Sequence, residues 1–158
     1  MKIEFLEEQR FDQWWLWLLL GLLGLLMGYG FYNQIVLGFA FGSHPMPNWG
    51  LAIFSVSVFT MIGFFWCIRL RTEINGEWLR IRFTPLGKRS VRWADVKSAE
   101  VIDYGFVGYG YRLGTKYGTV YNTQGRSGLA VILKNGDKFL VGTQKEEELR
   151  EVLQGIDL

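Results

Sequence analysis

The chain has 158 residues, of which 49% are hydrophobic and 16% aromatic, and its formal net charge is only +2. A single cysteine excludes an intramolecular disulfide, and a single histidine cannot by itself form a metal site or a catalytic centre. The small net charge also argues against nucleic acid as a partner.

Residues 1–13 form a charged segment ahead of the apolar part of the chain, with two basic and four acidic side chains. A cleaved signal peptide would instead begin with net positive charge, have a shorter apolar region and end at a small-residue cleavage site. We therefore expect residues 1–13 to be a cytoplasmic segment, and we expect the apolar segment that follows to be retained.

From Gln13 to Ile68 the chain runs 56 residues without an aspartate, glutamate, lysine or arginine. A helix rising 1.5 Å per residue crosses a hydrocarbon core of about 30 Å in roughly 20 residues, so this run is too long for one crossing. A cluster of helix-breaking residues at 42–48 divides the run. The pattern predicts a two-span transmembrane hairpin over residues 14–68.

The first span is expected from Trp14 to about Tyr32 and the second from Trp49 to Ile68, with tryptophan near the ends of both, as is typical of the headgroup boundary. Residues 33–41 are ambiguous. They can continue the first span at a tilt, leave the bilayer or bend back along its surface.

Three glycines, Gly21, Gly24 and Gly28, fall on one face of the first span, and the last two have small-xxx-small spacing. Close backbone approach at this face favours helix packing in lipid. The partner is either the second span of the same chain, near Ala52, Val56 and Thr60, or another copy in a homo-oligomer; the intramolecular use is favoured.

The positions of lysine and arginine predict the orientation. Arg69 and Arg71 follow the second span and Lys2 and Arg10 precede the first, whereas the loop at residues 42–48 has no lysine or arginine. Because positive charge stays on the cytoplasmic side, both termini are expected in the cytoplasm and the loop outside.

Residues 69–158 read as a small water-facing domain of short strands that ends in one helix. Asn75-Gly76 and Asn135-Gly136 are signals for tight hairpin turns, the latter of type I′. Strands are expected at residues 70–74, 77–84, 88–93, 96–104, 127–133 and 138–141, with a twisted, bulged hairpin within residues 105–128.

The final helix is predicted from a capping box and an apolar face. Thr143 and Glu146 have the spacing at which a hydroxyl and a carboxylate close free N–H groups at a helix start. The apolar residues then recur at one-face helical spacing, at Leu149, Val152, Leu153 and Ile156.

About seven antiparallel strands followed by one C-terminal helix is the pleckstrin-homology-like arrangement, a partly open barrel capped by a helix. Four short motifs make the resemblance more specific: Glu7 to Phe11 ahead of a Trp-rich span, Trp93 to Val96, Gly108 to Arg112, and Gly142-Thr143 before a Glu-rich helix. In these the chain resembles bacterial pleckstrin-homology-like membrane proteins. The resemblance implies a fold, a membrane anchor and a bacterial cytoplasmic membrane, and it implies no reaction.

No enzymatic activity and no cofactor are expected. Asp95 and Asp103 have no His, Cys or metal-ligand cluster near them in sequence, and the Gly-rich tract lacks the Lys-Ser/Thr of a phosphate loop. Asp95 is expected to bond the backbone at a turn between strands. In lipid-binding members of the family that the chain resembles, basic residues flank a long loop between the first two strands. Here that loop is Asn75-Gly76 with Glu73 and Glu77 beside it, so specific phosphoinositide binding is not expected.

Two surfaces are candidates for contact with an acidic partner or an anionic surface. One is a basic sheet face formed by Trp78, Arg80 and Arg82 together with the outward residues of the next strand, Lys88, Ser90 and Arg92. The other lies between Tyr104 and Gly136, a stretch without acidic residues whose candidate contacts are Tyr109, Tyr111 and Arg112. The alternative for both is an ordinary solvated face.

These observations predict a binding or scaffold module held at the cytoplasmic face of a bacterial membrane, as a component or regulator of a membrane complex. Its expected partners are the lipid bilayer and a membrane or cytoplasmic protein. The alternative is a regulatory domain that senses lipid or ligand through the basic face.

Overall fold

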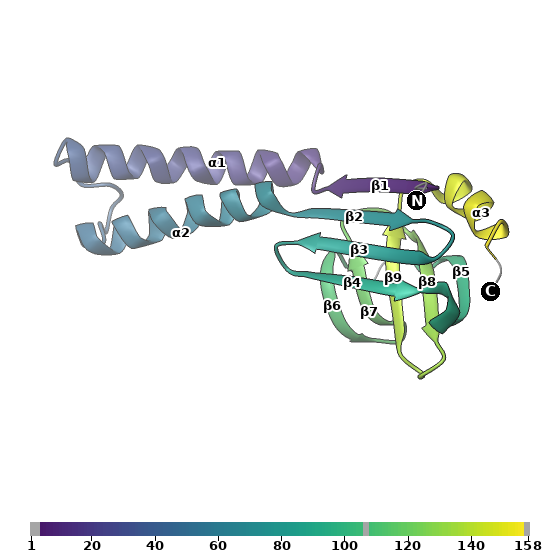
Figure 1. Ribbon diagram of the computed structural model, residues 1–158. Coiled ribbons are helices and arrows are strands. Elements are labelled where there is room, and N and C mark those ends of the chain that lie inside the picture. Colours follow the sequence, from purple (N-terminus) through teal and green to yellow (C-terminus); the bar gives the residue numbers. More distant parts are fainter. Residues whose placement is uncertain (1–3, 106–107, 157–158) are drawn as a thin grey trace. The chain divides into compact units, whose positions relative to one another are not determined.

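The computed structural model describes residues 4–105 and 108–156. Within this part, the chain forms two units, an apolar helical unit over Asp12–Cys67 and a β domain that joins the residues up to Phe11 with those from Ile68 onward. Figure 1 shows the elements of both units. The helical unit is therefore an insertion in the β domain rather than a segment that precedes it.

The helical unit contains α1 (Trp14–Phe31), a π-helical turn η1 (Tyr32–Val36) and α2 (Asn48–Cys67). The continuous helix Trp14–Val36 has 23 residues and α2 has 20, and both are long and apolar enough to cross a membrane. The two predicted helical spans are thus present.

The ambiguous segment after the first span bends back at the π turn. Gln34 is buried, and its Nε2 donates to the Met46 carbonyl at 2.6 Å and to Asn48 Oδ1 at 2.9 Å. Its Oε1 accepts the Phe41 N–H at 3.3 Å. The Gln34 side-chain amide thus bonds Phe41 in the connection and the residues at and just before the start of α2. The helix ends at Val36 and does not continue to Phe41.

The β domain has two sheets and a C-terminal helix. The first sheet has the order β1-β2-β3-β4, all antiparallel, and the second has the order β5-β8-β9-β7-β6, in which β7 and β9 are parallel. The bounds are β1 Phe5–Arg10, β2 Arg69–Ile74, β3 Trp78–Thr84, β4 Gly87–Arg92, β5 Val96–Asp103, β6 Gly110–Thr115, β7 Gly118–Asn122, β8 Ser127–Leu133, β9 Lys138–Thr143 and α3 Glu146–Gln154, with a 3-10 turn η2 over Trp93–Asp95.

These elements match the strands, the bulged hairpin and the C-terminal helix predicted from the sequence, although residues 106–107 of the hairpin stretch lie outside the described residues. The described residues contain nine strands rather than about seven, and the barrel is not closed. The inward residues of β3 and β4 are those that alternation predicts, since Leu79, Ile81, Phe83 and Val91 are all buried.

Strand β1 corrects the predicted domain boundary at residue 69. It pairs with β2 along its full length, from Phe5 opposite Ile74 to Arg10 opposite Arg69. Phe5 is 1% exposed and fills the core. The polar residues at the other inward positions of β1, which obscured the strand in the sequence, are also buried and hydrogen-bonded to the second sheet.

Neither tight turn is of type I′, a turn that needs positive φ at both central residues. Around Asn75 no residue has positive φ, and the Asn75 Oδ1 instead accepts the N–H groups of Glu77 and Trp78 at 3.0 and 2.7 Å. In the β8–β9 connection only Gly136 has positive φ, at 90°. The hairpins form as predicted, but asparagine side chains shape the turns.

The predicted capping box is wrong. Helix α3 begins at Glu146, with Lys145 at the N-cap position and no side-chain cap. The Thr143 hydroxyl donates to Glu7 of β1, and the Glu146 carboxylate accepts from Arg150. Both side chains are used by tertiary or intrahelical partners, which the local spacing does not reveal.

Candidate functional site

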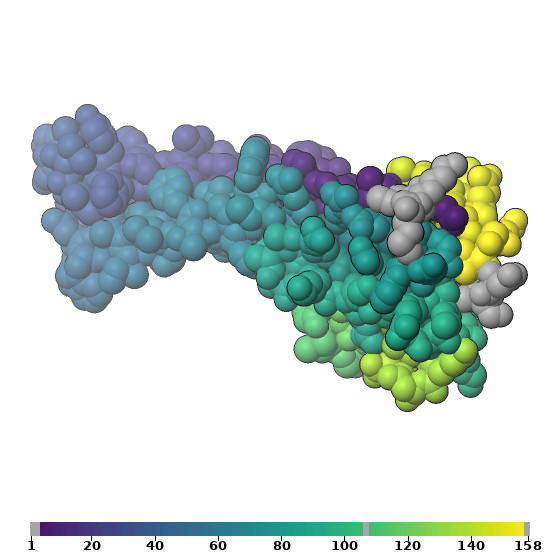
Figure 2. All heavy atoms as spheres, viewed as in Figure 1, coloured from purple at the N-terminus to yellow at the C-terminus, as the bar shows by residue number. Residues whose placement is uncertain are grey.

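The outward side chains of β3 and β4 form one continuous surface. Trp78 lies opposite Arg92, Arg80 opposite Ser90, and Arg82 opposite Lys88. Side chains directly opposite on one face of an antiparallel pair are about 4.5–5.5 Å apart at their Cβ atoms. The structure therefore brings together five of the predicted contact residues, which we call the basic face: Trp78, Arg80, Arg82, Lys88 and Arg92. The strands that carry it are the teal part of the β domain in Figure 2.

Two guanidinium groups flank the indole ring of Trp78. The Cζ atom of Arg80 lies 5.6 Å from the ring centroid and that of Arg92 lies 5.7 Å from it, both within the range of a cation–π contact. Arg92 also lies 3.7 Å from Asp95. The Trp78 ring thus contacts one guanidinium from its own strand and one from the neighbouring strand. These contacts restrain all three side chains.

The acidic residues of the first sheet neutralise only part of its positive charge. Glu73 pairs with Arg71 at 2.7 Å, and Glu8 lies 3.2 Å from Arg10 and 3.6 Å from Arg69. Among the described residues, three cations of the basic face have no carboxylate within ion-pair distance: Arg80, Arg82 and Lys88. These three charges are therefore available to an anion.

A depression of about 440 Å³ lies on this sheet. Its lining includes five basic side chains and a single acidic one, and it consists of Arg71, Glu73, Arg80, Ile81, Arg82, Lys88, Arg89 and Ser90. Because guanidinium groups present several N–H donors in a fixed plane, such a depression suits carboxylate or phosphate groups.

Arg89 is a functional candidate that the sequence analysis missed. It occupies an inward position of β4, where its Cζ lies 4.4 Å from the ring centroid of Phe139 and its Nη2 lies 3.0 Å from Asp137 Oδ2. It also acts to lower the pKa of the nearby Tyr121. Arg89 thus ties the edge of the first sheet to the second sheet. One signal in the sequence could have identified it: Arg89 lies between Lys88 and Ser90, which point outward, so alternation places this arginine on the inward side of the strand.

The second predicted surface is separate from the basic face. Tyr111, in β6, packs against the inward residue Phe83 of β3: the two rings are stacked with their centroids 6.5 Å apart, and the tilted ring of Tyr121 lies 5.2 Å from Tyr111. Burial, and then the neighbouring Tyr111, raise the pKa of Tyr121. Arg112 lies against the backbone of Gly108, and Tyr109 stands between them in the sequence. Tyr109, Tyr111 and Arg112 therefore do not extend the basic face.

The two aspartates considered for catalysis have structural contacts. Asp103 Oδ1 accepts the Gly105 N–H at 2.8 Å, and Asp95 pairs with Arg92. In the part of the chain that the structure describes, no group of three or more His, Cys, Asp or Glu side chains could hold a metal ion.

In the helical unit, the predicted glycine face packs on α2. A Cβ atom at Gly24 would lie 3.1 Å from Ile62 Cδ1, and one at Gly28 would lie 3.8 Å from Phe59, whereas nothing lies within 4 Å of a Cβ at Gly21. Of the predicted α2 partners, Val56 and Thr60 are wrong, because both are exposed and the glycine face meets Phe59 and Ile62. Ala52 is half-buried and lies seven residues before Phe59, on the same side of α2.

Comparisons with protein-family models, with curated proteins and with solved structures found no match to this chain.

Proposed function

We propose that this protein is a membrane-anchored binding module whose β domain docks an acidic protein partner on the basic face. The observation that carries the proposal is the set of three unneutralised cations, Arg80, Arg82 and Lys88, beside an aromatic ring held between two guanidinium groups. Desolvated arginine and tryptophan are the residue types that contribute most at protein interfaces.

The two apolar helices support the anchor. They enter the β domain between neighbouring strands, with residues 11–13 joining β1 to α1 and only Ile68 joining α2 to β2. Connections this short keep the domain within a few residues of the bilayer surface. With the basic residues placed as the positive-inside rule requires, this surface is the cytoplasmic face of a bacterial membrane.

The pleckstrin-homology-like identity of the domain is part of the same proposal. Two antiparallel-rich sheets followed by one amphipathic helix support it, as do the short motifs at Trp93–Val96 and Gly142–Thr143. The role that fits a fold of this kind with an open charged face is scaffolding or regulation of a membrane complex.

A second candidate is contact of the same face with anionic lipid headgroups, which the short connections to the helices favour. Each juxtamembrane basic residue contributes about 1 kcal/mol near such a surface. A specific phosphoinositide pocket is not proposed. The Asn75 turn, flanked by Glu73 and Glu77, joins β2 to β3, and the first two strands are joined by the apolar helical insertion rather than by a basic loop.

The test is gentle detergent extraction of the tagged full-length protein, with identification of co-purifying proteins. The triple variant Arg80→Glu, Arg82→Glu, Arg92→Glu should lose the specific partner while retaining the fold, since it removes no core side chain. The matched control reverses Lys134 and Lys138, at the β8–β9 hairpin, and should retain the partner.

A lipid measurement separates the two candidates. In one outcome, the full-length protein cross-links to acidic lipid in mixed liposomes, the triple variant does not, and no protein co-purifies. The lipid candidate then replaces the protein partner. Equal behaviour of the triple variant and the parent in both measurements would contradict any role of the basic face.

A further inference from the structure

Helix α3 carries two carboxylates that point away from the domain without a partner. Its first turn is acidic, but Glu146 is bonded by Arg150 at 2.8 Å and Glu148 is paired with Lys145 at 2.8 Å. Within the described residues, Glu147 and Glu151 are exposed and lie near no cation at ion-pair distance. Because they are four residues apart, both lie on one side of the helix, about 6 Å from each other.

The unneutralised arginines of the basic face have a similar spacing. Arg80 and Arg82 are two residues apart on β3 and point to the same side of the sheet, so about 6.8 Å separates them along the strand. Two carboxylates one helical turn apart can therefore each meet one guanidinium. Lys88, opposite Arg82, adds a third positive charge at the same place.

Within one copy these two surfaces do not meet. Helix α3 packs against β1 and β5 through Leu149, which is 1% exposed, and its acidic side faces away from that contact. The basic face lies on the outer side of β3 and β4. No ion pair among the described residues joins α3 to the first sheet. The complementary surfaces are therefore both open to another molecule.

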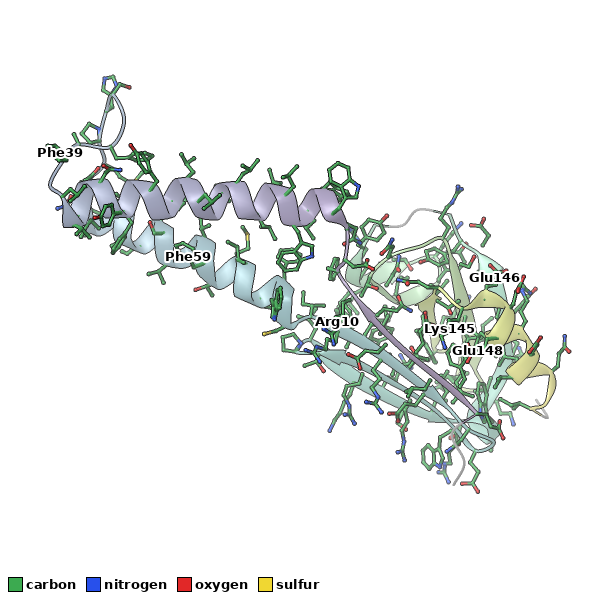
Figure 3. All side chains as sticks on the ribbon, turned by 90° about the horizontal axis from the view of Figure 1, so that it is seen from above. Arg10, Phe39, Phe59, Lys145, Glu146 and Glu148 are labelled. Atoms are coloured by element: carbon green, nitrogen blue, oxygen red, sulfur yellow. The ribbon has the colours of Figure 1, made fainter. Side chains whose placement is uncertain are left out.

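Helix α3 and the Arg80 part of the basic face lie toward the same end of the β domain, whereas Arg82 lies nearer the middle of β3. The chain leaves for α1 and returns from α2 at the Arg10–Arg69 pair, whereas Lys145, at the start of α3, lies 5.8 Å from the Phe5 ring at the opposite end of β1. Figure 3 shows Arg10 and the labelled α3 residues at opposite ends of the domain. Arg80 is near the α3 end too, since it pairs with Glu73, next to the Phe5–Ile74 pair.

We propose that the acidic side of α3, defined by Glu147 and Glu151, docks on Arg80 and Arg82 of a second copy of this chain. The inference rests on the proposed function, because it names the partner of the basic face, and on the proposed anchor, which gives all copies one orientation. Copies in one membrane then present both surfaces on the same side of the bilayer. The contact is head-to-tail, so it builds a ring or a row of copies in the membrane plane.

The experiment is energy transfer between donor- and acceptor-labelled full-length chains in liposomes of neutral phosphatidylcholine, with each label on Cys67, the one cysteine of the chain. Diluting the protein in lipid gives the self-association constant. Arg80→Glu with Arg82→Glu, and separately Glu147→Lys with Glu151→Lys, should each weaken association at least about tenfold, because each replaces two attractions by two repulsions. High salt should weaken association of the parent.

The decisive variant combines all four substitutions in one chain, which exchanges the charges across the contact and should restore association. Mixing the two double variants should restore it as well. Reversing Lys134 and Lys138 alters the charge of the domain as much as the arginine variant does and should have no effect. Failure of the exchanged chain to associate would overturn the inference.

The outcomes also separate this inference from the proposed function. If the Glu147 and Glu151 variant associates like the parent, while the basic-face variant loses its co-purifying protein, then the partner is a different protein and only the self-contact is refuted. If the basic-face variant keeps both its self-association and its co-purifying protein, both proposals are refuted.

Discussion

The carboxylate of Glu7 accepts a hydrogen bond of 2.7 Å from the hydroxyl of Thr143, which is 136 positions away in the chain. The same carboxylate accepts the Gln144 N–H at 2.7 Å. Next along β1, the Gln9 amide donates to the Gly142 carbonyl and accepts from the Thr123 hydroxyl. The strand that leads into the first apolar helix is thus fixed to the second sheet by buried polar groups, whose geometry is more specific than that of apolar packing.

Replacing Glu7 by alanine should destabilise the β domain by about 2–3 kcal/mol, because a charged acceptor of two buried hydrogen bonds is removed. Glu7→Gln keeps one acceptor oxygen and should cost less. Unfolding of the full-length protein in detergent, followed by tryptophan fluorescence against urea, measures both. Glu8→Ala, on the outward side of the same strand, is the matched control and should cost little; an equal loss there would contradict the role of Glu7.

The β domain should fold without its helical insertion, provided that β1 is kept. Phe11 and Ile68 follow directly on the last β1–β2 pair, so an Asn-Gly turn in place of residues 12–67 should close a two-residue hairpin. This protein should give a cooperative thermal transition by circular dichroism. The same protein without residues 1–11 loses Phe5 from the core and should show no cooperative transition. If both melt alike, β1 is not part of the folding unit.

The sequence predicts those strands whose inward positions are apolar. In β3, Leu79, Ile81 and Phe83 alternate with polar residues, and the strand, its pairing with β4 and the resulting basic face could all be anticipated. In β1 the inward positions include Glu7 and Gln9, which read as solvent-facing. Their partners lie more than a hundred positions away, so no local pattern reveals that they are buried and satisfied.

The misassigned contacts have a similar physical cause. The Thr143 hydroxyl has the spacing of a helix cap, but the helix begins only at Glu146. The hydroxyl donates to Glu7 of a distant strand, and its oxygen accepts the Lys145 N–H, which precedes the helix. The α2 helix is apolar on all sides, so no amphipathic stripe shows which of its residues face α1, and the predicted face was displaced from Phe59 and Ile62. Arg89 was missed because its partners lie about fifty positions away, Asp137 in the β8–β9 connection and Phe139 in β9 of the other sheet.

A large side chain at Gly24 should loosen the helical hairpin. A Cβ there would already lie 3.1 Å from Ile62 Cδ1, so Gly24→Leu forces the two helices apart and should cost about 1–3 kcal/mol. Gly21→Leu, which meets nothing within 4 Å, is the control and should be near neutral. Thermal stability in detergent reports the difference. A shift from a larger particle to a monomer with Gly24→Leu would show instead that this face joins two copies.

The orientation of the anchor can be tested with single cysteines in a Cys67→Ser background. The connection between the helices has no lysine or arginine, so Ser43→Cys should react with an impermeant thiol reagent added to intact cells. A cysteine at Asn135, in the β8–β9 turn, should react only after the cells are opened. Labelling of the Asn135 position in intact cells would reverse the proposed topology.

The buried hydroxyl of Tyr104 should make the free energy of unfolding of the β domain fall at alkaline pH. Burial is the main cause that raises the pKa of Tyr104 from 10.0 to about 12, and the neighbouring Tyr109 and Asp103 add to the shift. Between these two pH values the folded chain keeps a proton that the unfolded chain has lost. This contribution to stability is therefore complete below pH 10 and is lost as the pH rises toward 12.

Tyr104→Phe should flatten the loss of stability over that alkaline range. At neutral pH the substitution should be neutral or stabilising, because the hydroxyl is buried without a hydrogen-bond partner among the described residues. Tyr121→Phe is the matched control, since it removes a hydroxyl whose pKa the nearby Arg89 acts to lower, and it should cost about 1 kcal/mol at neutral pH. Urea midpoints at neutral and alkaline pH measure both effects. If Tyr104→Phe costs as much as Tyr121→Phe at neutral pH and leaves the alkaline slope unchanged, then the Tyr104 hydroxyl has a partner in the folded protein.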